Sequence, residues 1–116
     1  MEIGLYVAVA SLEASKVFYS QLFEKAPYIE TASFVGYEIT GGRFGLFLES
    51  AYAVPVQRGN STVANTKVAN IEAEFARVKA LKPQKMQADI ITVGPTRLFM
   101  FADPDDNVIE FFSVGE

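Results

Sequence analysis

Two glutamates are the first candidates for chemistry, because each lies within or at the end of an apolar run. Glu110 is the only charge in the run that ends the stretch FADPDDNVIEFF, residues 101–112, and Glu49 closes the run FGLFLE. A carboxylate in apolar surroundings can carry a raised pKa and act as a base, and it can also bind a metal ion or a cationic ligand. Each glutamate could equally be a solvated strand carboxylate without a role.

The composition limits the chemistry that these acids could share with other residues. The 116 residues include no histidine and no cysteine. This removes the commonest general base and imidazole metal ligand, and it excludes thiolate zinc sites, cysteine nucleophiles and disulfides. We therefore expect no catalytic residue, no resident metal and no cofactor.

Charge and hydropathy also limit the partners. Ten basic residues are scattered among 14 acidic ones, for a net charge of −4, so no concentrated positive surface is available for nucleic acid. The apolar runs are interrupted within about ten residues, too short to span a membrane. The start MEIGLYVAVA lacks a basic segment and a cleavage site, so we expect a cytoplasmic protein.

The elements that must position the glutamates begin with a strand and a helix. Residues 3–9, IGLYVAV, are almost wholly apolar, which favours a buried strand. Ser11 offers an N-cap for LEASKVFYSQLF, whose apolar residues recur at helical spacing. Three short apolar runs follow at 28–31, 34–40 and 44–50, the last two separated by Gly41-Gly42, a hairpin signal. The first half is predicted to be βαβββ.

The second half repeats this order. VASLEAS at 9–15 recurs as VANIEAE at 68–74, an offset of 59 residues. Asn70 caps the second predicted helix, which Pro83 ends, and strands are expected around 61–68, 87–93, 96–101 and 107–114. We predict an α+β fold in one domain, residues 1–116. Two βαβββ modules, 1–50 and 61–116, are joined by the linker 51–60 and set their sheets around a shared crevice with the helices outside.

These features together resemble a known superfamily. The paired modules, the helical stretch SLEASKVFYSQLF and the turn and strand ADPDDNVIEFF are similar to those of the vicinal oxygen chelate superfamily. Its members include glyoxalase I, extradiol dioxygenases, fosfomycin-resistance enzymes and bleomycin-resistance proteins. One departure is Asp106, where the family pattern has Gly; Asp tolerates a left-handed turn, so we expect the turn to form.

The resemblance implies four metal-ligand positions, on the first, fourth, fifth and eighth strands. Gly4 and Val63 lie seven residues before the two helix motifs, Glu49 ends the run FGLFLE, and Glu110 lies in the C-terminal motif. Two carboxylates remain where a catalytic transition-metal or zinc site needs three protein ligands. Magnesium or calcium could accept oxygen ligands with waters, so a weak site stays an alternative.

A pocket for a small molecule is the use of the crevice that the remaining residues favour. Strand alternation places Tyr6 on the face of Gly4, Phe47 on that of Glu49, and Phe112 on that of Glu110. The absent side chain at Gly4 leaves space for a planar ligand. The predicted ligand-binding set is Tyr6, Phe47, Glu49, Asn65, Lys67, Phe99, Glu110 and Phe112. For Phe99 the alternation leaves open whether it faces the crevice or the helix.

The resemblance implies a metal-independent binding protein, similar in kind to the bleomycin-resistance proteins, which sequester a ligand without transforming it. It implies a homodimer with sites formed between subunits, and the acidic net charge suits a small aromatic or cationic ligand.

Two alternatives stay open. One is a metal-dependent lyase, epimerase or dioxygenase that uses Glu110 and Glu49. The other is a protein-interaction role, in which Phe47, Phe99 and Phe112 fill the crevice.

Overall fold

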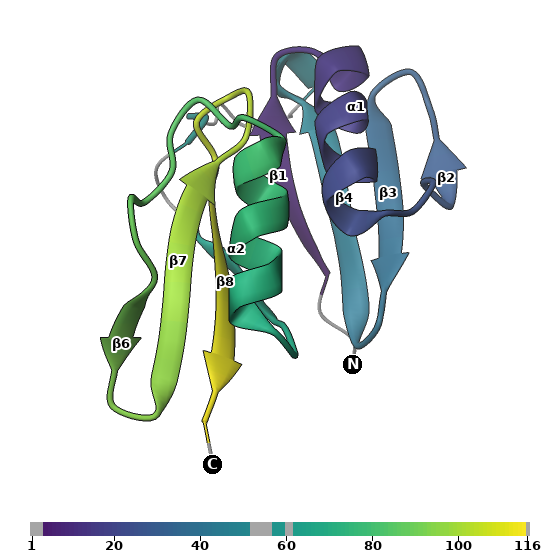
Figure 1. Cartoon of the computed structure of the whole chain (residues 1–116). Coiled ribbons are helices and arrows are strands. Elements are labelled where there is room, and N and C mark those ends of the chain that lie inside the picture. Colours follow the sequence, from purple (N-terminus) through teal and green to yellow (C-terminus); the bar gives the residue numbers. More distant parts are fainter. Residues whose placement is uncertain (1–3, 52–56, 60–61, 116) are drawn as a thin grey trace.

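The structure, a computed structural model, describes residues 4–51, 57–59 and 62–115 and contains two four-stranded mixed sheets (Figure 1). The first sheet and its helix comprise β1 Leu5–Val9, α1 Leu12–Phe23, β2 Ile29–Glu30, β3 Phe34–Ile39 and β4 Gly42–Leu48, followed by a short 3-10 helix, η1 Glu49–Ala51. The second comprises β5 Ala64–Lys67, α2 Ile71–Ala80, β6 Ile91–Val93, β7 Thr96–Ala102 and β8 Val108–Val114. The predicted α+β fold of two βαβββ modules is confirmed.

Both sheets have the same topology. The first has the strand order β1-β4-β3-β2 and the second β5-β8-β7-β6, so the first strand of each module pairs with its last. These two pairings, β1 with β4 and β5 with β8, are parallel, and the others are antiparallel. Most of the predicted linker, residues 51–60, lies outside the described residues, so that boundary stays a prediction. None of the described helices is long and apolar enough to cross a membrane.

The two helix starts follow the same local chemistry. The Ser11 hydroxyl accepts a hydrogen bond from the Ala14 amide at 3.2 Å, and the Asn70 side chain accepts one from the Ala73 amide at 3.0 Å. Each cap satisfies an amide that the first helical turn leaves without a partner. Both predicted caps are confirmed, and with them the 59-residue offset.

The core lies between each helix and one face of its sheet (Figure 1). The buried residues of the first module include Val9, Tyr19, Leu22, Val35, Tyr37 and Leu46, and those of the second include Ile71, Val78, Phe99, Phe101, Ile109 and Phe111. Because side chains alternate along a strand, the residues between these point to the opposite side of the sheet. We call that side the helix-free face.

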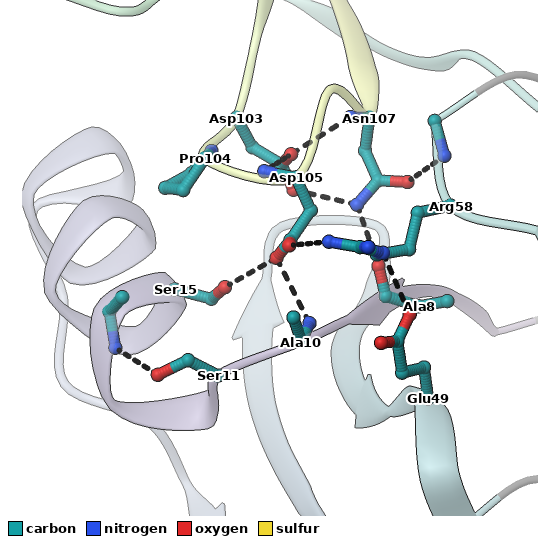
Figure 2. Close-up of polar contacts among 12 residues, drawn as sticks. Ala8, Ala10, Ser11, Ser15, Glu49, Arg58, Asp103, Pro104, Asp105 and Asn107 are labelled. Carbon is teal, nitrogen blue, oxygen red and sulfur yellow. Dashed lines mark hydrogen bonds and ion pairs between the residues drawn. The ribbon is translucent and has the colours of Figure 1, made fainter.

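One turn joins the modules. This clasp turn, residues 103–107 between β7 and β8, reaches from the second module to the first, where the Asn107 side-chain amide donates to the Ala8 carbonyl at 2.8 Å (Figure 2). The Asp105 carboxylate accepts from the Ala10 amide at 3.2 Å and from the Ser15 hydroxyl at 3.3 Å. The clasp turn therefore holds the end of β1 and the start of α1 against the second sheet.

A buried carboxylate organises the clasp turn from within. Asp103 has no exposed surface, and its oxygens accept from the Asp105 and Asn107 amides at 2.8 Å and from the Tyr19 hydroxyl at 2.8 Å. Burial raises the pKa of Asp103, opposed by the hydrogen bonds from Asn107 and Tyr19. Asp106 adopts a φ of 65°, so the left-handed turn expected in place of the family's Gly is present.

Candidate functional site

An aromatic cluster covers part of the helix-free face of the first sheet. Tyr6 pairs with Gly45 on β4, and Phe47 pairs with Phe34 on β3. The ring centroids of Tyr6 and Phe47 lie 5.4 Å apart, those of Phe34 and Phe47 5.9 Å, and those of Tyr6 and Phe34 6.4 Å. We call these three rings the aromatic ledge. Two of them, Tyr6 and Phe47, belong to the predicted site, whereas Phe34 was missed.

Two glycines make room for the ledge. A Cβ atom added to Gly45 would lie 2.4 Å from Cζ of Phe34, and one added to Gly36 would lie 2.9 Å from the same ring. Both distances are shorter than a normal carbon–carbon contact, so the Phe34 ring can lie across the sheet only because side chains are absent there.

A pocket of about 950 Å³ opens at the end of the same face. Its lining residues are Gly4, Lys25, Ala26, Tyr28, Glu38, Ile39, Thr40, Gly41, Gly42 and Arg43. A Cβ atom at Gly4 would meet no atom of the described residues within 4 Å, so among these residues the space expected beside Gly4 is present. The volume suits a small-molecule site. We call this cavity the Gly4 pocket.

The charged groups of the Gly4 pocket come from one strand pair and from the segment after α1. Glu38 and Arg43 are cross-strand partners on β3 and β4. They lie two residues from Gly36 and Gly45, on the same face of the sheet. The Arg43 guanidinium lies over the Tyr28 ring, 5.4 Å from its centroid. The Lys25 ammonium donates to the Glu38 carbonyl oxygen at 2.5 Å. Sequence reasoning missed these residues, because nothing local indicates that the segment after α1 wraps the end of the sheet.

Four of the five predicted residues of the second sheet share its helix-free face: Asn65, Lys67, Glu110 and Phe112. Asn65 of β5 pairs with Glu110 of β8, Lys67 pairs with Phe112, and Met100 of β7 stands opposite Glu110. Among the described residues, no ring contact connects these side chains with the aromatic ledge of the first sheet.

A second pocket, of about 630 Å³, lies nearer the clasp turn. It is lined by Arg58, Gly59, Lys85, Met86, Gln87, Met100, Phe101, Ala102, Asp106 and Val108. Its cations are already paired, because Arg58 contacts Glu49 at 2.7 Å and Asp105 at 2.9 Å, and Lys85 contacts Asp106 at 3.4 Å. These ion pairs explain the raised pKa of Arg58, first through its hydrogen bond to Asp105.

Phe99 lies elsewhere than predicted. Its side chain is fully buried on the helix side of the second sheet, in edge-to-face contact with Phe75 of α2 at 5.1 Å. Arg97, two residues earlier, pairs with Glu72 of α2, which gives the same orientation. Phe99 therefore belongs to the core and does not line a ligand site.

Glu49 also differs from its predicted position. β4 ends at Leu48, so Glu49 begins η1 and pairs with Arg58 beside the clasp turn (Figure 2). The register identifies a different counterpart of Glu110. Asn65 pairs with Glu110 and, 59 residues earlier, Tyr6 pairs with Gly45. The fourth-strand position equivalent to Glu110 is therefore Gly45, which has no side chain.

The residues at the family's ligand positions do not fit a transition-metal site. Of Gly4, Gly45, Val63 and Glu110, only Glu110 carries a donor atom in its side chain. Within residues 4–51, 57–59 and 62–115, no three acidic side chains gather closely enough to hold a metal ion. A single carboxylate falls short of the three protein ligands that such sites use.

Comparison with known proteins identifies the fold. No family model matches the sequence, and no curated protein matches it. Among solved structures, a glyoxalase/bleomycin resistance protein/dioxygenase from Nocardioides has a TM-score of 0.81 at 18% identity, covering 100% of this chain and 85% of that one. A glyoxalase-related enzyme from Fulvimarina pelagi has a TM-score of 0.80 at 19% identity, covering 97% and 88%. A glyoxalase/bleomycin resistance protein from Albidiferax ferrireducens T118 has 0.77 at 22%, covering 95% of each chain. The chain thus has the fold of the vicinal oxygen chelate superfamily, as the resemblance predicted.

Proposed function

From this fold as premise, we propose that the chain binds a small organic molecule in the Gly4 pocket and performs no metal-dependent chemistry on it. The observation that carries the proposal is the open space at Gly4, the position where the superfamily pattern places a metal ligand. Beside it, the aromatic ledge offers rings on which a planar group can stack. A concave pocket that combines apolar and aromatic surface with a small number of placed polar groups is typical of a ligand-binding site.

We further propose that the protein is a cytoplasmic homodimer that sequesters its ligand. Support for a second copy comes from the helix-free face of the second sheet, where Ile91, Val93 and Val114 are 46%, 61% and 48% exposed. Apolar side chains gathered on one exposed face favour an interface. A dimer through this face would agree with the assembly that the superfamily resemblance implies.

The two alternatives have less support. A lyase, epimerase or dioxygenase that uses Glu110 and Glu49 would need both carboxylates at one centre, but Glu49 is engaged by Arg58. An interaction protein with a crevice closed by Phe47, Phe99 and Phe112 would need Phe99 on the helix-free face, and it is in the core.

Filling the Gly4 pocket tests the proposal. The change Gly4→Leu places a side chain where no atom of the described part of the chain lies within 4 Å, so it should block binding without unfolding the protein. Gly115→Leu is the matched control, because a Cβ atom there meets only the Pro95 carbonyl oxygen at an ordinary 3.5 Å. Native mass spectrometry of freshly purified protein should find a small molecule retained by the control and absent from Gly4→Leu.

Calorimetry with manganese, nickel, zinc and iron(II) ions addresses the enzyme alternative. We expect no specific binding. Micromolar binding of any of these ions that disappears in Glu110→Gln would overturn the metal-independent proposal.

A further inference from the structure

Among the described residues, the two cations of the Gly4 pocket, Lys25 and Arg43, lack the acidic partners that five of the eight other basic side chains have. Five basic side chains form ion pairs with acids: Lys16, Arg58, Arg77, Lys85 and Arg97. Arg43 is the only arginine without a carboxylate partner among the described residues, and Lys25 of the same pocket also has none. Two positive groups therefore line one cavity without an ion-pair partner among the described residues.

Arg43 stacks on Tyr28 and donates no hydrogen bond to a described residue. Its guanidinium carbon lies 5.4 Å from the centroid of the Tyr28 ring, a cation–π geometry that orients the planar group by its face. The N–H groups at the edge of the guanidinium stay available, and their fork matches the paired oxygens of a carboxylate or phosphate. A stacked arginine loses less conformational freedom on binding an anion than a mobile one does.

The remaining charge of the pocket does not cancel this attraction. Glu38, the cross-strand partner of Arg43, forms no ion pair with a described residue, and its backbone carbonyl accepts from Lys25. Among the described lining residues, two cations against one carboxylate leave a net charge of +1. In the second pocket, by contrast, Arg58 and Lys85 are bound to acids of the clasp turn and Glu49.

We propose that the Gly4 pocket selects a small organic anion, a carboxylate or phosphate monoester, bound by Arg43 and Lys25 with its planar part directed to the aromatic ledge. This inference rests on the proposed binding function and specifies its ligand class. It replaces the cationic ligand expected from the net charge of −4, because the charge within a pocket acts at shorter range than the sum over the surface.

Four probes of similar size separate the possibilities: benzoate, phenyl phosphate, benzamide and benzylamine. Each is titrated into ¹⁵N-labelled protein, and the backbone amide shifts of residues 40–43 report on the pocket. Because a charge-assisted hydrogen bond contributes about 1.5–3 kcal/mol, we expect at least one anion to bind about tenfold or more tightly than benzamide. Binding of benzoate alone identifies a carboxylate site, and binding of phenyl phosphate alone identifies a phosphate site.

Variants assign the effect to the pocket. Arg43→Gln should lower the affinity for the anion to that for benzamide, and Arg43→Lys should restore part of it, because Lys keeps the charge but not the planar fork. Lys79→Gln, which removes an exposed cation from α2, is the control and should leave the affinity unchanged. The amide spectra also show whether each variant is folded.

The outcomes test the anion selectivity separately from the proposed binding function. If benzamide or benzylamine shifts the pocket amides as strongly as both anions do, the anion selectivity is wrong while the binding function stands. If anion binding survives Arg43→Gln, the assignment to Arg43 is wrong. If none of the four probes shifts these amides and no retained molecule is found by mass spectrometry, both proposals fail.

Discussion

Removing the Tyr19 hydroxyl should weaken the attachment of the clasp turn to α1. Tyr19 is fully buried, and its hydroxyl donates to Asp103 at 2.8 Å. A hydrogen bond to a charged group contributes about 1.5–3 kcal/mol. Asp103 keeps its donors from Asp105 and Asn107, and the ring contact with Phe44 at 5.0 Å is retained. We therefore expect Tyr19→Phe to lower the free energy of unfolding by about 1.5–2 kcal/mol, near the lower limit of that range.

Urea denaturation followed by far-UV circular dichroism measures this loss, and thermal melting should show a decrease of about 6–8 °C for a chain of this length. Tyr28→Phe is the matched control, because Tyr28 is 47% exposed and its hydroxyl bonds to no described residue. The control should change the free energy of unfolding by less than about 0.5 kcal/mol. A Tyr19→Phe effect as small as that of the control would refute the view that this hydroxyl helps to hold the modules together.

Three further predictions concern pH, the aromatic ledge and assembly. Burial first, and then Asp103, raise the pKa of Tyr19 well above 10.0, so the stability it contributes is present below that pH and is lost above it, where the unfolded chain releases the proton. Unfolding at about pH 8 and about pH 11 should show this loss in the wild type and a smaller one in Tyr19→Phe. Gly45→Val should cost about 1–3 kcal/mol in urea denaturation, because its Cβ would lie 2.4 Å from the Phe34 ring; an unchanged midpoint would contradict the packing described. Val93→Glu should convert a wild-type dimer to monomers in size-exclusion chromatography with light scattering, and a monomeric wild type would remove the basis of the dimer proposal.

Local chemistry explains why the elements could be predicted from the sequence. Ser11 and Asn70 cap their helices with atoms only three residues away, so capping needs no knowledge of the fold. The 59-residue offset between the two caps also relates β1 to β5. In the structure these two strands occupy equivalent places, because β1 pairs in parallel with β4 and β5 pairs in parallel with β8. The sequence motif around Glu110 likewise placed that residue on its strand.

The errors arose where the answer depends on pairing between distant segments. Glu49 lies one residue beyond the end of β4, and only the register with β1 shows that Gly45 is the counterpart of Glu110. The side chains of Arg97, Phe99 and Phe101 share one face of β7, as strand alternation predicts. The sequence of a strand does not show which of its two faces a helix will cover. The stacking of Arg43 on Tyr28 required the segment after α1 to turn around the sheet end, which no short-range pattern encodes.

The clasp turn also bears on how the chain is made. Its contacts with the first module join residues 84 to 99 positions apart, from Tyr19 with Asp103 to Ala8 with Asn107. During synthesis, β1 and α1 leave the ribosome long before these partners exist, and non-local contacts of this kind form late in folding. Until residues 103–107 emerge, the Ala10 amide and the Ser15 and Tyr19 hydroxyls lack their aspartate acceptors, so the emergence of the clasp turn is itself the event that locks the two halves together.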